Sequence, residues 1–167
     1  ILLTNDGELA HRLTHPSFGV TKEYLVAVKG NVTPEALETL KKGLFLAHPV
    51  HRGPERREGG PVRVKRAAVE EVSIVEHRAD KSRGDRTVLK VILQEGQNRE
   101  IRRLMSRLGF GVHRLERVAI GTLRLKGLKS GNWRMLTPNE VQTLRAAVAE
   151  PVKKRGDSRP AKGKPRQ

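Results

Sequence analysis

Cysteine is absent from this 167-residue sequence, and aromatic side chains are scarce: three phenylalanines, one tyrosine and one tryptophan. The lack of cysteine excludes disulfides, cysteine-based zinc sites and cysteine nucleophiles, and it is typical of a reducing cytoplasm. No apolar run approaches the roughly 18 residues of a membrane-spanning helix. An aromatic residue that packs on a ligand must therefore come from a short list, in which Tyr24 is the only tyrosine.

Charge of one sign dominates the sequence: 34 lysines and arginines stand against 18 acidic residues, a formal net charge of +16. Such a surplus predicts a polyanionic partner, because basic side chains that meet phosphates release counterions. Nucleic acid and an anionic membrane are the candidates, and without a spanning run nucleic acid is favoured. No metal site is predicted, because Arg12 stands where a zinc-protease helix, with its two histidines four apart, would need a glutamate.

Hydrophobic periodicity predicts one folded domain over residues 1–150. Strands are expected at 22–29, 62–75, 87–93, 112–120, near 123 and at 133–136. Helices are expected at 8–13, 34–42, 99–108 and 138–148, with a loop at 48–60. The strand at 87–93 is apolar enough to be covered on both faces. Residues 1–4 are expected to end a buried strand, and Asp6 is expected to cap the first helix.

The last segment, residues 151–167, differs in kind from the rest. It carries seven basic residues and one acidic residue, with several prolines and no apolar pattern. This composition predicts a basic disordered tail that is attracted to RNA, with a merely solubilising tail as the alternative. The charge that remains in residues 1–150 is still strongly positive, so the basic character belongs to the domain as well.

The most informative segment, residues 95–105, predicts an amphipathic helix that Asn98 caps. At about 100° per residue, one face is apolar and consists of Ile101, Leu104, Met105 and Leu108. The opposite face is suited to phosphates and consists of Arg99, Arg103 and Arg107. Arg102 falls on the border, where a half-buried guanidinium needs an anionic partner. The pattern alone gives equal weight to two interpretations of Arg102. It pairs with a catalytic carboxylate, or it has a structural role, either in an ion pair or with its stem buried and its charged end in solvent.

This segment resembles the third motif of the RsuA-type ribosomal RNA pseudouridine synthases, a Gly-x-Asn-Arg-x-x-Arg-Arg-Leu/Met run whose arginine pairs with the catalytic aspartate. Residues 3–16 are similar to the run that follows the family's catalytic motif. Residues 22–26 are similar to its second motif, and 114–131 continue the match. The resemblance covers residues 1 to about 144 and is closest to the branch that acts on large-subunit RNA.

The resemblance implies an α+β fold, with a mixed, mostly antiparallel central sheet and flanking helices. It implies that Arg102 holds the catalytic aspartate ionised, and that Tyr24 stacks on a flipped target uridine. Cofactors and metals are not required. The implied RNA-binding residues are Lys22, Asn98, Arg99, Arg103 and Arg107, with the loop at 52–57. A solvated surface charge accounts for each of these basic residues equally well.

The departure from the family is the nucleophile, because its Gly-Arg-Leu-Asp motif is not among these 167 residues. We expect a catalytic domain cut before Ile1, lacking its N-terminal part and therefore inactive alone. The full-length protein is then expected to be a cytoplasmic, monomeric enzyme that isomerises one uridine of ribosomal RNA in a pre-ribosomal particle. The alternatives are a non-catalytic RNA-binding relative of the same fold and a basic structural protein of the ribosome.

Overall fold

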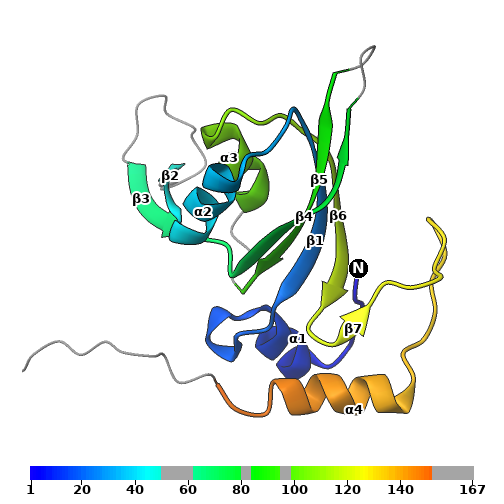
Figure 1. Ribbon diagram of the computed structural model, residues 1–167. Coiled ribbons are helices and arrows are strands. Elements are labelled where there is room, and N and C mark those ends of the chain that lie inside the picture. Colours follow the sequence, from blue (N-terminus) through cyan, green and yellow to red (C-terminus); the bar gives the residue numbers. More distant parts are fainter. Residues whose placement is uncertain (50–61, 80–83, 95–98, 152–167) are drawn as a thin grey trace, which may run out of the picture.

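The computed structural model describes residues 1–49, 62–79, 84–94 and 99–151. A five-stranded sheet runs through the centre in the order β4-β5-β1-β6-β7, and β2 and β3 form a separate two-stranded sheet (Figure 1). All pairings are antiparallel, so the predicted α+β fold with a mostly antiparallel central sheet is confirmed. The strands are β1 (Lys22–Lys29), β2 (Leu44–Pro49), β3 (Val62–Ala67), β4 (Glu71–Arg78), β5 (Arg86–Leu93), β6 (Val112–Ile120) and β7 (Leu123–Arg124). The helices are α1 (Gly7–Thr14), α2 (Pro34–Lys42), α3 (Glu100–Arg107) and α4 (Pro138–Ala147), with a 3₁₀ turn at Pro16–Phe18.

Strand β1 is the middle of the central sheet. Val26 of β1 lies opposite Leu89 of β5 on one side and Leu115 of β6 on the other. Side chains alternate along a strand, so Val26 and Val28 share one face of the sheet. Both are fully buried there, beneath α2 and α3.

The main apolar core lies between this sheet face and the two helices α2 and α3. Its completely buried members include Leu40 of α2 and Leu104 and Met105 of α3. Helix α2 begins where predicted, because Thr33 accepts a hydrogen bond from the backbone of Ala36 and proline follows at the first helical position. Burial of this apolar face is the main term that holds both helices on the sheet.

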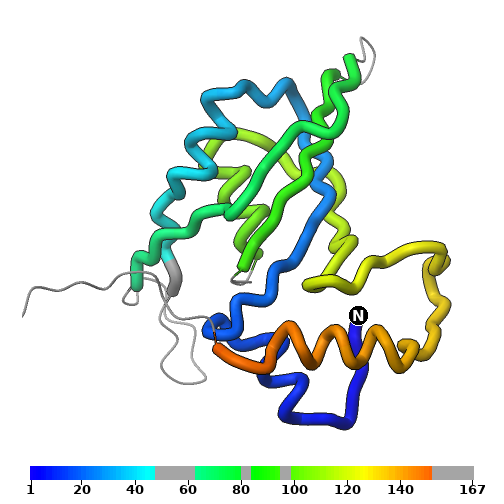
Figure 2. The backbone as a smooth tube through the Cα atoms, turned by 60° about the horizontal axis from the view of Figure 1, so that its bottom comes forward, coloured from blue at the N-terminus to red at the C-terminus, as the bar shows by residue number. Residues whose placement is uncertain are grey.

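A second, smaller apolar core lies between α1 and α4, at the end of the central sheet away from α2 and α3 (Figure 1). Leu13, Val20, Leu144 and Val148 are its buried members. Figures 1 and 2 show the two helices side by side, although they come from opposite ends of the chain. Arg12 of α1 crosses the junction and donates hydrogen bonds to the carbonyls that follow α4.

The predicted strand at 62–75 is wrong as a single element, because β3 and β4 belong to different sheets. The chain turns between them so that Val69 donates to the carbonyl of Leu40 and Glu70 donates to that of Ile92. Strand β2 was not predicted. Gly43 introduces β2 at φ 85°, and a Cβ there would lie 2.8 Å from the Cβ of Ala68.

Further expectations about the fold are wrong or fall outside the described residues. Residues 1–4 and 133–136 are not strands in the described structure, and Ile1 and Leu3 are almost fully exposed. The second face of β5 is only half-buried rather than covered. Helix α3 has Arg99 as its N-cap, in a left-handed conformation and without a side-chain cap bond. Asn98, the 52–57 loop and the predicted tail after Pro151 lie outside the described residues.

Candidate functional site

Helix α3 lies on the side of the central sheet that carries the main core. Ile101, Leu104 and Met105 are buried in that core, as the apolar periodicity predicts. Arg102 stands at the border of the buried stripe, and its predicted half-burial is confirmed. One nitrogen of its guanidinium donates to the carbonyl of Val112 on β6 at 3.2 Å. This bond orients the side chain, and in the described part of the chain no carboxylate forms an ion pair with it.

A groove of about 530 Å³ runs along the arginine-bearing side of α3. From α3 and its cap it is lined by Arg99, Arg102, Arg103, Ser106 and Arg107. From β2 and β3 it is lined by Phe45, Leu46, Ala47 and Val64. Sequence periodicity placed three of these arginines on one face, and the structure shows that Arg102 faces the same groove. The lining therefore joins four cations to an apolar wall.

Arg103 has a structural task within this groove. Its guanidinium donates a hydrogen bond to the backbone carbonyl of Ala47, so it ties α3 to β2. Arg99 and Arg107 are exposed on either side of it along the helix. The predicted phosphate-binding role of all three remains a prediction.

Tyr24 lies on β1 and packs, half-buried, against the main core. Alternation along β1 puts it on the same sheet face as Val26, which is the face that α3 covers. Its neighbour across the ladder to β6 is Arg117. The two residues expected to support catalysis, Tyr24 and Arg102, therefore lie on the same side of the central sheet.

Lys22, at the start of β1, is more buried than a surface phosphate ligand would be. Its ammonium donates to the carbonyl of Val20 at 2.7 Å and to that of Gln94 at 3.2 Å. Burial lowers the pKa of Lys22, and the nearby charge of Arg117 lowers this pKa further. One of the three ammonium protons is left for a phosphate.

Two notable residues were not predicted from the sequence. Glu100, in the first turn of α3, is only 4% exposed, and a carboxylate at a helix N-terminus is favoured by the helix dipole. Phe45 is 62% exposed and borders the arginine groove. Glu100 could have been identified from the sequence, because it lies two residues after the expected cap, Asn98. The exposure of Phe45 depends on the tertiary structure.

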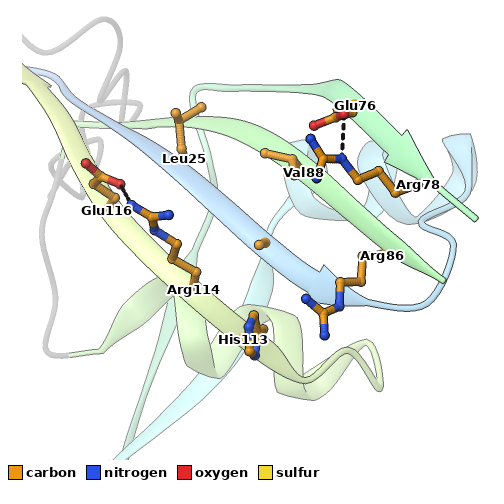
Figure 3. A pocket seen from close by; sticks show the side chains of 9 residues that line it. Leu25, Glu76, Arg78, Arg86, Val88, His113, Arg114 and Glu116 are labelled. Atoms are coloured by element: carbon orange, nitrogen blue, oxygen red, sulfur yellow. Dashed lines mark hydrogen bonds and ion pairs between the residues drawn. The ribbon is translucent and has the colours of Figure 1, made fainter. Parts of the chain in front are cut away.

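The opposite face of the sheet carries a second depression, of about 470 Å³ (Figure 3). Its apolar floor is formed by Leu25, Ala27 and Val88, and charged residues surround it. Two of its arginines are paired within their own strands: Arg78 with Glu76 at 2.6 Å and Arg114 with Glu116 at 2.8 Å. None of the predicted site residues lines this depression.

The described residues hold no group of three or more histidine and acidic side chains placed to bind a metal ion. Within the same residues, no helix combines the length and the apolar character that crossing a membrane requires.

The arrangement of the sheet and helices is similar to that of a solved pseudouridylate synthase structure. A solved structure described as "Crystal structure of pseudouridylate synthase" matches with a TM-score of 0.59 over 84% of this chain and 52% of that chain, at 23% identity. The family model described as RNA pseudouridylate synthase matches residues 1–107. The chain belongs to the RNA pseudouridylate synthase family, and the resemblance carried by its motifs is confirmed.

Curated relatives agree with this assignment. Ribosomal large subunit pseudouridine synthase B of Bacillus subtilis is 34% identical over 146 residues, which cover 87% of this chain and 52% of the relative. An uncharacterized RNA pseudouridine synthase of Mycobacterium bovis is 39% identical over 148 residues, covering 89% and 50%. The chain thus spans about half the length of the curated relatives it matches.

Proposed function

We propose that the protein to which these residues belong isomerises a specific uridine of ribosomal RNA, in the large subunit, to pseudouridine. The observation that carries the proposal is the family match over residues 1–107, a range that contains both Tyr24 and Arg102. The name of the relative from Bacillus subtilis, ribosomal large subunit pseudouridine synthase B, supports the choice of RNA.

In the proposed reaction, an aspartate of the family's Gly-Arg-Leu-Asp motif promotes cleavage of the N-glycosidic bond of a uridine that has been flipped out of its stack. The bond from C1′ of the ribose to N1 of the uracil breaks, the uracil turns, and a bond from C1′ to C5 forms in its place. The proton on C5 is lost and N1 gains a proton, so the product is an isomer of uridine. The motif is not among these residues, so the aspartate would have to come from outside this sequence. No cofactor or metal takes part in the proposed reaction.

Arg102 is the proposed partner of that aspartate. An opposite charge within about 4–6 Å favours the ionised carboxylate, and an arginine remains charged at any working pH. Its half-buried position and its bond to the carbonyl of Val112 support the assignment, because both restrict where the guanidinium can point.

Tyr24 is the proposed stacking partner of the target base. The proposed phosphate contacts are Lys22, Asn98, Arg99, Arg103 and Arg107. We further propose that residues 1–150 are a catalytic domain without its N-terminal part and that 151–167 is a basic tail that attracts RNA. The proposed enzyme is a cytoplasmic monomer.

The proposal is tested by incubating ribosomal RNA with this chain and with the chain extended by the coding sequence upstream of Ile1. Pseudouridine in nuclease digests is measured by mass spectrometry. We expect product only from the extended chain, provided that the extension encodes Gly-Arg-Leu-Asp. Product from the present chain would refute the need for an external aspartate. An extension without the motif, or one that has it and yields no product, would favour a non-catalytic RNA-binding relative.

Two substitutions in the active extended protein test the residue roles. Arg102→Gln is expected to remove most activity, by a factor of about 10² or more, because the aspartate loses its charged partner. Arg114→Gln, on the opposite sheet face, is the matched control and is expected to stay active. Tyr24→Phe keeps the ring but not the hydroxyl. Full activity in that variant would limit Tyr24 to stacking, and a large loss would indicate proton transfer.

A further inference from the structure

Phe45 is a large aromatic side chain that is left mostly uncovered, with 62% of its surface exposed. Ala47 follows two residues later on the same face of β2, and Val64 of β3 lies directly opposite Ala47. Val64 is also 60% exposed. These three side chains form a small apolar platform, which we call the Phe45 platform, on one wall of the arginine groove.

The other wall of the groove consists of cations. Arg99, Arg102, Arg103 and Arg107 all line it, and none of the described residues that line it is acidic. The two walls are held in register, because Arg103 donates to the carbonyl of Ala47. The platform and the arginines therefore face one shared space of about 530 Å³ rather than two independent surfaces.

An aromatic face next to several guanidinium groups is the combination that binds single-stranded nucleic acid. A base stacks on the ring through its π-face, whatever its identity, and the flanking phosphates pair with arginine. Bases within a duplex are already stacked and cannot use such a platform. An acidic peptide would be held by the same arginines but would gain little from an exposed phenyl ring.

We propose that the groove binds an unpaired nucleotide of the RNA substrate, with its base stacked on Phe45 and its phosphates at Arg99 and Arg107. This inference rests on the proposed function, because it takes the partner to be RNA. It adds a second contact next to the pocket for the target uridine, because Arg102, the proposed partner of the catalytic aspartate, also lines this groove. This contact selects single-stranded RNA beside the modified position.

The first experiment measures binding of the chain to a 12-nucleotide oligouridine and to a 12-base-pair RNA duplex at several salt concentrations. Phe45→Ala is expected to weaken oligouridine binding between about fivefold and a hundredfold, since stacking on one aromatic residue is worth that much. Duplex binding and the salt dependence should stay unchanged, because no charge is lost. Arg107→Gln should instead reduce the slope of log affinity against log salt by about 0.7 for the single strand.

A matched control comes from β4, where Val75 is 57% exposed and lies outside the groove. Val75→Ala should leave both affinities unchanged. Circular dichroism and urea unfolding of Phe45→Ala exclude loss of the fold as the cause. Equal loss on single strand and duplex, or no loss on either, would overturn the proposal, as would a wild-type chain that binds neither probe.

A second measurement reports the stack directly. Phe45→Trp is placed in a Trp133→Phe background, so that the only tryptophan lies on the platform. Oligouridine should quench its fluorescence, and the duplex and a polyglutamate peptide should not. Quenching by the peptide at the same salt concentration would indicate a protein partner and would overturn the proposal.

Failure of this inference differs from failure of the proposed function. If the extended chain makes pseudouridine while Phe45→Ala binds oligouridine normally, the proposed role of the Phe45 platform is refuted and the proposed enzymatic function is retained. If Phe45→Ala selectively loses single-strand binding but the extended chain forms no pseudouridine, the proposed role of the Phe45 platform is retained and the proposed enzymatic function is refuted.

Discussion

Arginine side chains have different roles in two parts of this structure, the part around α1 and α4 and the part around α3. Around α1 and α4 it completes helix ends: Arg145 pairs with Asp6 at 3.0 Å, and Arg134 pairs with Glu140 at 2.6 Å. Around α3 the arginines line a groove instead, and Arg102 bonds a backbone carbonyl rather than a described carboxylate. From the net charge alone, arginines would be expected to have the same role throughout the domain. The structure divides these arginines by role, although Arg103 has both roles, because it lines the groove and also ties α3 to β2.

The two parts also differ in how they are held together. The core under α3 is large and contains completely buried side chains from the sheet and from two helices. The core between α1 and α4 has four buried residues, and caps and ion pairs supplement it. We therefore expect large effects from apolar substitutions near α3 and smaller effects from polar ones near α4.

The largest effect is expected from Leu104→Ala. Leu104 is fully buried at the centre of the main core, and removal of its side chain leaves a cavity. The free energy of unfolding should fall by about 2–5 kcal/mol, measured by urea titration. Ser106→Ala, exposed on the same helix, should change it by less than about 0.5 kcal/mol. Similar values for both variants would mean that α3 is not held by its apolar face.

Thr137→Ala should cost about 1 kcal/mol of unfolding free energy, because it removes the capping box of α4. In that box Thr137 accepts from the backbone of Glu140 at 3.2 Å, and Glu140 accepts from the backbone of Thr137 at 2.8 Å. Thr143→Ala, within the same helix, should be neutral or slightly stabilising, since alanine is the better helix former. A larger loss from Thr143→Ala would contradict the importance of the cap.

The difference in role between the arginines near α4 and those near α3 is tested by comparing Arg145→Gln with Arg107→Gln. Arg145→Gln should lower the free energy of unfolding by up to about 1 kcal/mol, the usual range of an exposed ion pair. Arg107→Gln should leave stability within about 0.5 kcal/mol and weaken RNA binding in a salt-dependent manner. Urea unfolding and RNA titration measure the two effects. If both variants lost stability and neither lost RNA affinity, the contrast between the two parts would fail.

Low pH should lower the free energy of unfolding, because protonation of Glu140 weakens its bonds at the start of α4. This is the smallest of the expected effects. The hydrogen bond from Arg134, followed by that from the backbone of Thr137, lowers the pKa of Glu140 from 4.5 to about 2. A carboxyl with a lower pKa in the folded state stabilises the fold above pH 4.5. That contribution is lost as the pH falls towards 2. Glu140→Gln should therefore show a flatter decline in stability between pH 4.5 and 2 than the parent chain, measured by urea titration at each pH.

Part of the site could be read from the sequence. The half-burial of Arg102 follows from a 100° turn per residue, and the side of the sheet that Tyr24 occupies follows from strand alternation. The bonds from Lys22 to the carbonyl of Gln94 and from Arg103 to the carbonyl of Ala47 could not be predicted, because these partners lie 72 and 56 residues away. Phe45 was missed for the same reason, since the arginines of the groove that it borders come from α3 and its cap.

What the sequence determined by itself is local. The bounds of β1 and β6, the caps at Asp6, Thr33 and Thr137, and the apolar stripe of α3 all follow from chemistry within a few residues. Only the tertiary structure decided that 62–75 divides between two sheets, that residues 1–4 remain unpaired with any described strand, and that α3 meets β2 along a groove. Those outcomes depend on hydrogen bonds and packing between segments far apart in the chain, which periodicity does not encode.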